Sequence, residues 1–280
     1  MIGAFQKDSA LLQDIRQARQ DAGCFQLWWL GQSGFLVHYN GSYFLFDPYL
    51  SDSLTKKYDG TAKPHVRISE RVIDPALLDM ISCVTSSHNH TDHLDAETLL
   101  PISAANPGCI LLLSEANLEF AKARLLGTSF TYAGLNETTP WSNPPWTVHG
   151  ITAAHNEIVR NELGQSAYLG FVLKFGPFSI YHSGDTLWHD DLVPQLGHHR
   201  VDVALVPING NDPARGVAGN LNVHEAACLS KAIGARLAVP HHFQMFAFNS
   251  ADPADFVAAC ESVHQPHRVM GLGEKLEVTA

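Results

Sequence analysis

The sequence predicts a single α/β domain with two mixed β-sheets that are covered by helices. Strand-like and helix-like runs alternate in both halves of the 280-residue chain, and no Pro/Gly/Ser-rich linker or run of charge separates the halves. A content of 45% apolar and 16% charged residues is sufficient for a sizeable core. We therefore expect one domain over residues 1–280, with residues 1–24 as an N-terminal helical extension.

The first elements are a short amphipathic helix and the start of an antiparallel sheet. Apolar residues at helical spacing predict a helix over residues 8–22 that ends at Gly23. Asn40-Gly41 tolerates positive φ angles and predicts a tight hairpin. The flanking β-rich runs cover residues 25–30, 34–39 and 43–47.

The remaining chain alternates between strands and helices. Strands are predicted at residues 81–86, 110–113, 147–153, 167–175, 178–181, 203–206 and 237–239. Helices are predicted at residues 95–103, 115–126, 223–234 and 253–263. This alternation in each half is typical of mixed sheets with helical crossovers.

Charge and composition exclude several classes of partner. The 18 Lys and Arg residues against 28 Asp and Glu give a net charge of −10, so we expect no nucleic-acid partner. The start of the chain lacks the apolar region of a signal peptide, and no run reaches the length of a membrane span, so we expect a cytoplasmic protein without a membrane partner. The five cysteines form no C-x-x-C pair and are predicted to be reduced core residues.

The 16 histidines include a dense cluster at one predicted strand-to-helix turn. Four potential metal ligands, His88, His90, Asp92 and His93, fall within six residues. His88 and His90 project to the same side of an extended backbone, whereas Asp92 and His93 point elsewhere as the helix begins. One loop can therefore serve two adjacent metal ions.

This His-x-His-x-Asp-His pattern resembles the signature of the metallo-β-lactamase superfamily. Four further motifs of that superfamily match in order, at Asp47 in FLFDP, His155 in TAAH, Asp185 in HSGDT and the histidine pair in PHHF at residues 240–243. The resemblance covers about residues 25 to 245. It implies a four-layer αββα sandwich with the metal site where the strand ends converge.

The resemblance also implies a role for each motif residue. One divalent ion would be held by His88, His90 and His155, and a second by Asp92, His93 and a histidine of the 241–242 pair. Asp185 would bridge the two ions, and Asp47 would orient a ligand histidine. A set of His and Asp ligands accepts zinc, manganese or iron. His90 stands where the redox di-iron members have glutamate, which favours hydrolysis over electron transfer.

The C-terminal ligand is predicted to be His242 because the family pattern places it two residues after a proline. Pro240-His241-His242-Phe243 fits this pattern with His241 as the intervening residue. Adjacent residues of an extended segment point to opposite sides, so both histidines cannot face one metal ion.

The function implied is that of a hydrolase that uses a metal-activated hydroxide to open a small, anionic ester or lactone. The segments WLGQSGF at 29–35, DPYLSD at 47–52 and GNLN at 219–222 are similar to the L-ascorbate 6-phosphate lactonase-like branch. A phosphodiesterase or nuclease of the same superfamily is the alternative enzyme. A non-catalytic binding protein that keeps the fold is the alternative outside enzymes.

Basic residues after Asp47 suggest how an anionic substrate would be recognised. From Lys56 to Arg67 there are four basic residues and one acidic residue, and we expect this loop to overhang the pocket with Arg67 as the first choice for an oxyanion contact. His182 and His189 flank Asp185 and are further candidates for the pocket. The expected partner is a small-molecule substrate, and the oligomeric state stays open, with a homo-oligomer among the alternatives.

Overall fold

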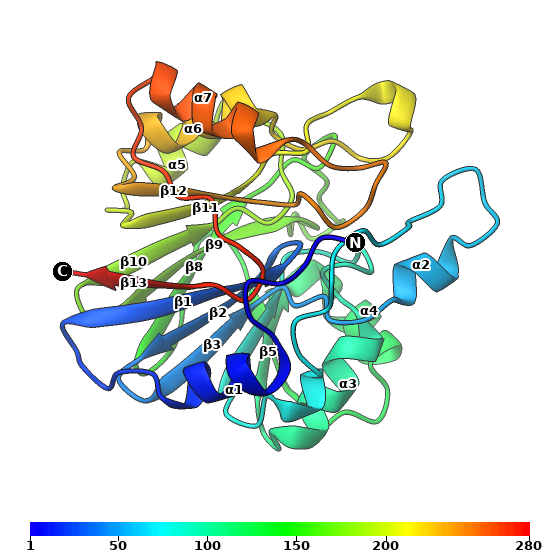
Figure 1. Ribbon diagram of the computed structural model, residues 1–280, viewed down its shortest axis with the longest axis vertical. Coiled ribbons are helices and arrows are strands. Elements are labelled where there is room, and N and C mark those ends of the chain that lie inside the picture. Colours follow the sequence, from blue (N-terminus) through cyan, green and yellow to red (C-terminus); the bar gives the residue numbers. More distant parts are fainter.

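The computed structural model describes all 280 residues and contains two mixed β-sheets with helices on their outer faces. In Figure 1 the sheets lie next to each other in the middle, with α1, α3 and α4 on one side and α5, α6 and α7 on the other. This order of helix, sheet, sheet and helix confirms the predicted four-layer sandwich.

The first sheet has seven strands in the order β13-β1-β2-β3-β4-β5-β6. Its first four strands pair antiparallel, and β3 to β6 run parallel. In chain order the strands are β1 (Cys24–Gly31), β2 (Gly34–Tyr39), β3 (Ser42–Phe46), β4 (Cys83–Ser86), β5 (Ile110–Ser114), β6 (Thr131–Leu135) and β13 (Lys275–Thr279).

The second sheet has six strands in the order β12-β11-β10-β9-β8-β7. Here β10, β11 and β12 are parallel, whereas the pairs β10/β9, β9/β8 and β8/β7 are antiparallel. Strand β8 therefore runs in the same direction as β10 to β12. The strands are β7 (Trp141–Asn143), β8 (Trp146–Thr152), β9 (Leu169–Phe175), β10 (Phe178–His182), β11 (Val203–Pro207) and β12 (Leu237–His241).

Short helices complete the outer layers, and polar side chains cap several of their N-termini. Asp95 accepts a backbone hydrogen bond at the start of α3, and Asn222 with Glu225 forms a capping box at the start of α6. None of the helices combines the length and hydropathy that a membrane crossing requires. The helices are α1 (Asp8–Arg16), α2 (Ser53–Lys57), α3 (Ala96–Ala105), α4 (Leu118–Arg124), α5 (Leu192–Leu196), α6 (Val223–Ala232) and α7 (Pro253–Ser262), with 3₁₀ turns η1 (Pro75–Leu77), η2 (Glu115–Asn117) and η3 (Pro213–Arg215).

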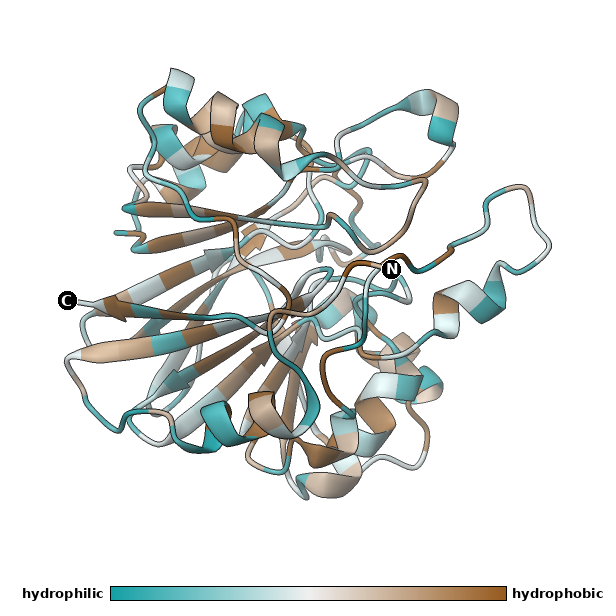
Figure 2. Ribbon diagram, viewed as in Figure 1, coloured by the Kyte–Doolittle hydropathy of each residue, from teal (hydrophilic) through white to brown (hydrophobic).

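Aromatic side chains join the two sheets in one continuous core of 66 buried residues. Phe25 of β1 packs edge-on against Phe175 and Phe178 of the second sheet, with ring centroids 5.2 and 5.0 Å apart. Each such pair contributes about 0.5–1.5 kcal/mol beyond the burial of its area. The strands are accordingly the most hydrophobic part of the chain in Figure 2, and the outer helices carry hydrophilic faces.

The hairpin between β2 and β3 confirms the turn predicted at Asn40-Gly41. Both residues have positive φ angles, 45° and 83°, as a two-residue hairpin turn requires. His38 ties this turn to β1, because its Nδ1 donates to Gln26 Oε1 at 2.7 Å and its Nε2 accepts from the Gly41 N–H at 3.0 Å. The neutral imidazole satisfies both bonds.

Two expectations about the periphery need correction. The first helix ends at Arg16 and not near Gly23, because the Asp21 carboxylate accepts from Arg19 and from the Gly23 N–H and thereby forms a turn. This helix packs on the domain through Leu11 and Ile15, which belong to the main core. All five cysteines are free, but Cys228 is exposed on α6 and is not a core residue.

We predict that His38 makes the stability of the hairpin depend on pH. Burial lowers the pKa of His38 from 6.5 to about 4, so between these values the unfolded chain binds a proton that the folded chain excludes. The stabilising effect of His38 is complete above about pH 6.5 and is lost as the pH falls toward about 4. The difference in urea midpoint between wild type and His38→Gln should therefore narrow over this interval. His224→Gln, which changes an exposed side chain of α6, is the control. A difference in urea midpoint between wild type and His38→Gln that stays constant with pH would contradict the prediction.

Candidate metal centre

The predicted ligands lie together at the carboxyl ends of strands from both sheets. Asp47 follows β3 and the loop from Ser87 to Asp95 follows β4, whereas His155, Asp185 and His242 follow β8, β10 and β12. These strands run in one direction within each sheet, so their carboxyl ends meet at one edge of the sandwich. Residues that are far apart in the sequence thus form one site.

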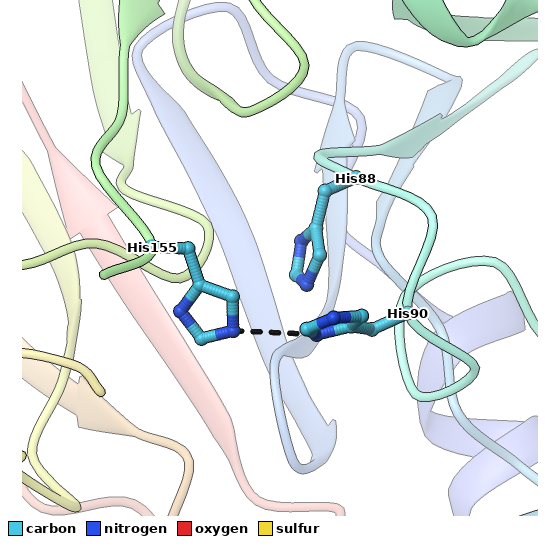
Figure 3. A group of neighbouring side chains, drawn as sticks. All are labelled: His88, His90 and His155. Carbon is cyan, nitrogen blue, oxygen red and sulfur yellow. Dashed lines mark hydrogen bonds between the residues drawn. The ribbon is translucent and has the colours of Figure 1, made fainter. Parts of the chain in front are cut away.

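His88, His90 and His155 form the first donor group, with ligand atoms within 4.8 Å of one another. Figure 3 shows the three rings directed toward one point, with His155 Nε2 3.2 Å from His90 Nδ1. His155 Nδ1 donates to the carbonyl of Gly219 at 2.9 Å, and His88 Nδ1 contacts Ser87 Oγ at 3.0 Å. Because a carbonyl only accepts, the Gly219 bond places the proton of His155 on Nδ1 and leaves the lone pair of its Nε2 free.

The second donor group contains Asp92, His93, Asp185 and His242, also within 4.8 Å. His93 Nε2 lies 3.6 Å from Asp92 Oδ2 and 3.4 Å from Asp185 Oδ1. His242 Nε2 lies 3.5 Å from Asp92 Oδ2 and 3.2 Å from Asp185 Oδ2. Two carboxylates and two imidazoles therefore face one another.

Asp185 lies between the two groups. Its Oδ2 is 3.8 Å from His155 Nε2 of the first group, while both of its oxygens contact histidines of the second group. Asp185 therefore lies within 4 Å of candidate ligand atoms in both groups.

Asp47 lies behind His93 and is fully buried. Its carboxylate accepts from His93 Nδ1 at 2.8 Å, from Thr85 Oγ1 at 2.7 Å and from the Ser87 N–H at 3.1 Å. A carboxylate on Nδ1 turns Nε2 of the same ring toward the second group. Asp47 therefore contacts a candidate ligand and not the cleft.

The charges of the cluster shift its pKa values in opposite directions. Burial alone would raise the pKa of Asp185, but His242 and His93 outweigh burial and hold this pKa well below its ordinary value. Burial alone would lower the pKa of His93, but Asp185 and Asp92 raise it well above its ordinary value. His88 is surrounded by other histidines, so burial and their repulsion lower its pKa well below 6.5. The centre thus combines ionised carboxylates with a neutral imidazole.

The unpaired atoms of the centre fit divalent metal ions. His88 Nε2, His93 Nε2 and Asp185 Oδ1 are buried and have no hydrogen-bonding partner. A buried polar atom without a partner lowers the stability of the fold by about 1–3 kcal/mol, so three such atoms in one place indicate that a ligand binds there. Imidazole nitrogens and carboxylate oxygens are the donors that zinc, manganese and iron accept.

The structure turns His242 toward the second donor group and His241 away from it. His242 has a φ angle of 59°, and this left-handed backbone directs its ring to Asp92 and Asp185. His241 stacks on His182 with ring centroids 5.1 Å apart and contacts Ser33 Oγ at 3.1 Å.

A cleft of about 380 Å³ opens above the two donor groups. Its walls include the basic residues Lys57, Lys63 and Arg124 and the rings of Tyr58, His65 and Phe246. The loop after Asp47 therefore does border the cleft, as expected from its charge.

The three substrate residues expected from the sequence lie elsewhere, so these expectations are corrected. Arg67 donates to Asp52 at 2.7 Å and to the Ser51 carbonyl, and its guanidinium lies over the ring of Tyr49. Since its side chain is only 9% exposed, it supports the loop and does not line the cleft.

His182 and His189 also point away from the cleft. The Nε2 atom of His182 donates to the Ser33 carbonyl at 2.8 Å, and that of His189 lies 3.1 Å from the Thr152 carbonyl. Sequence reasoning missed Gln32, which contacts Asp92 and His242. Its position directly after the strand β1, in the WLGQSGF motif, was the available signal.

Comparisons with known proteins agree with this architecture. The family model described as "Beta-lactamase superfamily domain" matches residues 42–243, a range that includes both donor groups and Asp47. A protein of Opitutus terrae named UPF0173 metal-dependent hydrolase is 31% identical over 256 residues, which cover 90% of this chain and 100% of that protein.

Two solved structures share the fold. Igni18, a metallo hydrolase from Ignicoccus hospitalis, has a TM-score of 0.66 at 21% identity over 92% of this chain and 99% of its own. The metallo-beta-lactamase fold protein YhfI from Bacillus subtilis has a TM-score of 0.67 at 17% identity over 91% of this chain and 100% of its own.

We predict that His242→Ala weakens metal binding, whereas His241→Ala mainly lowers the stability of the fold. His242→Ala should lower the affinity for one equivalent of added zinc by about 100-fold or more, because it removes a donor atom. His241→Ala should leave that affinity within about threefold and act mainly on stability, because it removes a buried stacked ring. Isothermal titration calorimetry and the melting temperature measure the two effects. The reverse pattern would make His241 the ligand.

Proposed function

The chain belongs to the metallo-β-lactamase superfamily and, within it, to the UPF0173 metal-dependent hydrolase family, and from this membership we propose that it opens a small, anionic ester or lactone with two bound divalent metal ions. The observation that carries the proposal is the position of Asp185 between two groups of donor atoms at the base of a cleft.

The two donor groups would each hold one ion. His88, His90 and His155 supply three nitrogens to the first ion, and Asp92, His93 and His242 supply an oxygen and two nitrogens to the second. Asp185 contacts the second group through both of its oxygens and approaches His155 of the first group through Oδ2, so it would be shared. When bound, such ions supply a water that ionises near neutral pH and polarise the carbonyl oxygen of the scissile bond.

Neighbouring residues orient the ligand histidines and keep the Asp185 carboxylate ionised. Asp47 holds the His93 ring through Nδ1, and the Gly219 carbonyl holds the His155 ring in the same way. Asp185 stays ionised because its pKa is lowered, so it acts as a permanent negative charge and not as a proton donor. Fixed donors need no rearrangement during the reaction, which is how a preorganised site lowers its barrier.

The walls of the cleft support a substrate with an anionic group and an apolar body. Lys57 and Lys63 reach the cleft from α2 and the loop that follows it, and Lys63 Nζ donates to the Gly216 carbonyl on the opposite wall. His65 stacks on Tyr58 with centroids 4.3 Å apart and meets Phe246 edge-on at 5.1 Å. We propose a sugar-acid lactone that carries a phosphate or carboxylate, in line with the resemblance to the L-ascorbate 6-phosphate lactonase-like branch.

Arg124 supports the ligand loop rather than the substrate. Its Nη1 donates to the carbonyls of Asn89 and Leu94, at 2.6 and 3.3 Å, which flank the three ligands of this loop from His90 to His93. The two lysines are therefore the cations left to meet an oxyanion.

The proposed reaction is tested with a panel of model substrates on metal-loaded protein. We expect turnover of p-nitrophenyl esters and lactones, its loss on chelation, and a decrease of at least about 100-fold in kcat for Asp185→Asn, since charge at this position supports both ions. Turnover of bis-p-nitrophenyl phosphate alone would favour a phosphodiesterase. No turnover of any substrate would favour a binding protein.

The anionic preference is tested by removing the cleft lysines one at a time. Lys57→Ala and Lys63→Ala should each raise KM for an anionic lactone by roughly 3- to 10-fold and spare a neutral ester, because an exposed cation contributes about 1 kcal/mol to an ionic contact. Lys56→Ala is the matched control, since Lys56 pairs with Glu97 at 2.7 Å and does not line the cleft. Equal changes for anionic and neutral substrates would contradict the charge preference.

A further inference from the structure

Gln32 is a buried polar residue whose side chain meets the second donor group. It follows β1 in a turn where Gly31 has a φ angle of 99° and Gln32 one of 49°. A side chain at Gly31 would come within 3.0 Å of the Met245 methyl group, so the turn is packed tightly. Gln32 itself is 1% exposed.

The carboxamide of Gln32 contacts two candidate ligands at once. Its Nε2 donates to Asp92 Oδ2 at 2.8 Å and lies 3.0 Å from His242 Nε2. Its Oε1 is buried and has no hydrogen-bonding partner. An uncharged amide beside a carboxylate can hold it by a hydrogen bond without neutralising it, which leaves the negative charge available for a cation.

The backbone of the same residue holds His242 from the other side. The Gln32 carbonyl accepts from the His242 N–H and from Trp29 Nε1, both at 3.1 Å. Trp29 in turn stacks on Phe243, the residue after His242, with ring centroids 4.6 Å apart. The left-handed φ angles of Gln32 and His242 cost about 1–3 kcal/mol each and persist only where the surroundings fix them, as these contacts do.

We propose that Gln32 is a positioning residue for the second metal ion, whose carboxamide holds Asp92 and whose carbonyl holds His242 in the arrangement that ligates the ion. This inference rests on the proposed function, because it requires that Asp92, His93 and His242 bind a metal ion. It assigns to Gln32 no contact with the substrate. Its action is confined to the second ion, because both of its side-chain contacts are with that group.

The variant Gln32→Met tests this role, because methionine keeps the length of the side chain and removes its polar atoms. Zinc is titrated into the metal-free full-length chain and the two binding steps are resolved by calorimetry. We expect the affinity of one step to fall by about 10- to 100-fold, as is usual when a residue that orients a ligand is lost, and the other step to stay unchanged. Cobalt absorption should show the same selective loss of one site.

Ser33→Ala is the matched control in the same turn. Ser33 Oγ contacts His241 but none of the candidate metal-ligand atoms, so both zinc-binding steps should keep their wild-type affinities. Should Gln32→Met fail to fold, Gln32→Asn shortens the side chain by one methylene, withdraws the amide from Asp92 and should give the same selective loss.

Several outcomes would overturn the inference. Wild-type affinities for both steps in Gln32→Met would show that Asp92 and His242 need no support from the amide. Equal weakening of both steps would show a general effect on the fold. A wild-type chain that binds fewer than two zinc ions would instead overturn the proposed two-ion function, and this inference with it.

Discussion

The structure depends on holding two carboxylates, the half-buried Asp92 and the buried Asp185, among histidines where the two sheets meet. Their ligand oxygens lie within 4.8 Å of each other, where like charges repel, and the rings of His93 and His242 contact both carboxylates and offset this repulsion. Donors from the first sheet come from the loop after β4, and donors from the second follow β8, β10 and β12. Neither sheet contains a complete site. The packing of the sheets, anchored by Phe25 against Phe175 and Phe178, is thus a condition for the chemistry.

The turns that carry the site differ from the regular strands that lead to them. Asp47, Gln32 and His242 each follow a strand, and each has a left-handed φ angle, of 33°, 49° and 59°. A strand that continued straight would direct successive side chains to alternate faces of its sheet. The abrupt turns instead bring Gln32 and His242 together across the edge between the sheets and direct Asp47 to His93. Hydrogen bonds hold each of these three residues in its strained conformation.

Much of the fold and most of the centre could be predicted because their signals are local. The apolar runs predicted the central strands, and Asn40-Gly41 predicted the hairpin. The candidate metal ligands each follow a strand in a recognisable motif. Three edge strands, β6, β7 and β13, were missed. Strand β13 alternates exposed and half-buried residues and pairs with β1 from the far end of the chain, so its formation depends on a non-local partner.

Side-chain direction within the cleft could not be predicted, because it depends on partners that the sequence does not place. Arg67 was the preferred cation by chemistry, yet Asp52 and the Ser51 carbonyl occupy its guanidinium, whereas Lys57 and Lys63 reach the cleft. A bidentate donor is the better anion ligand only while it is free, and the same geometry makes it the better partner for a nearby carboxylate. Neither lysine pairs with a carboxylate: Lys63 Nζ donates to the Gly216 carbonyl and Lys57 Nζ to Thr91 Oγ1. The proposed preference for an anionic substrate would therefore rest on Lys57 and Lys63, the weaker cations without a carboxylate partner.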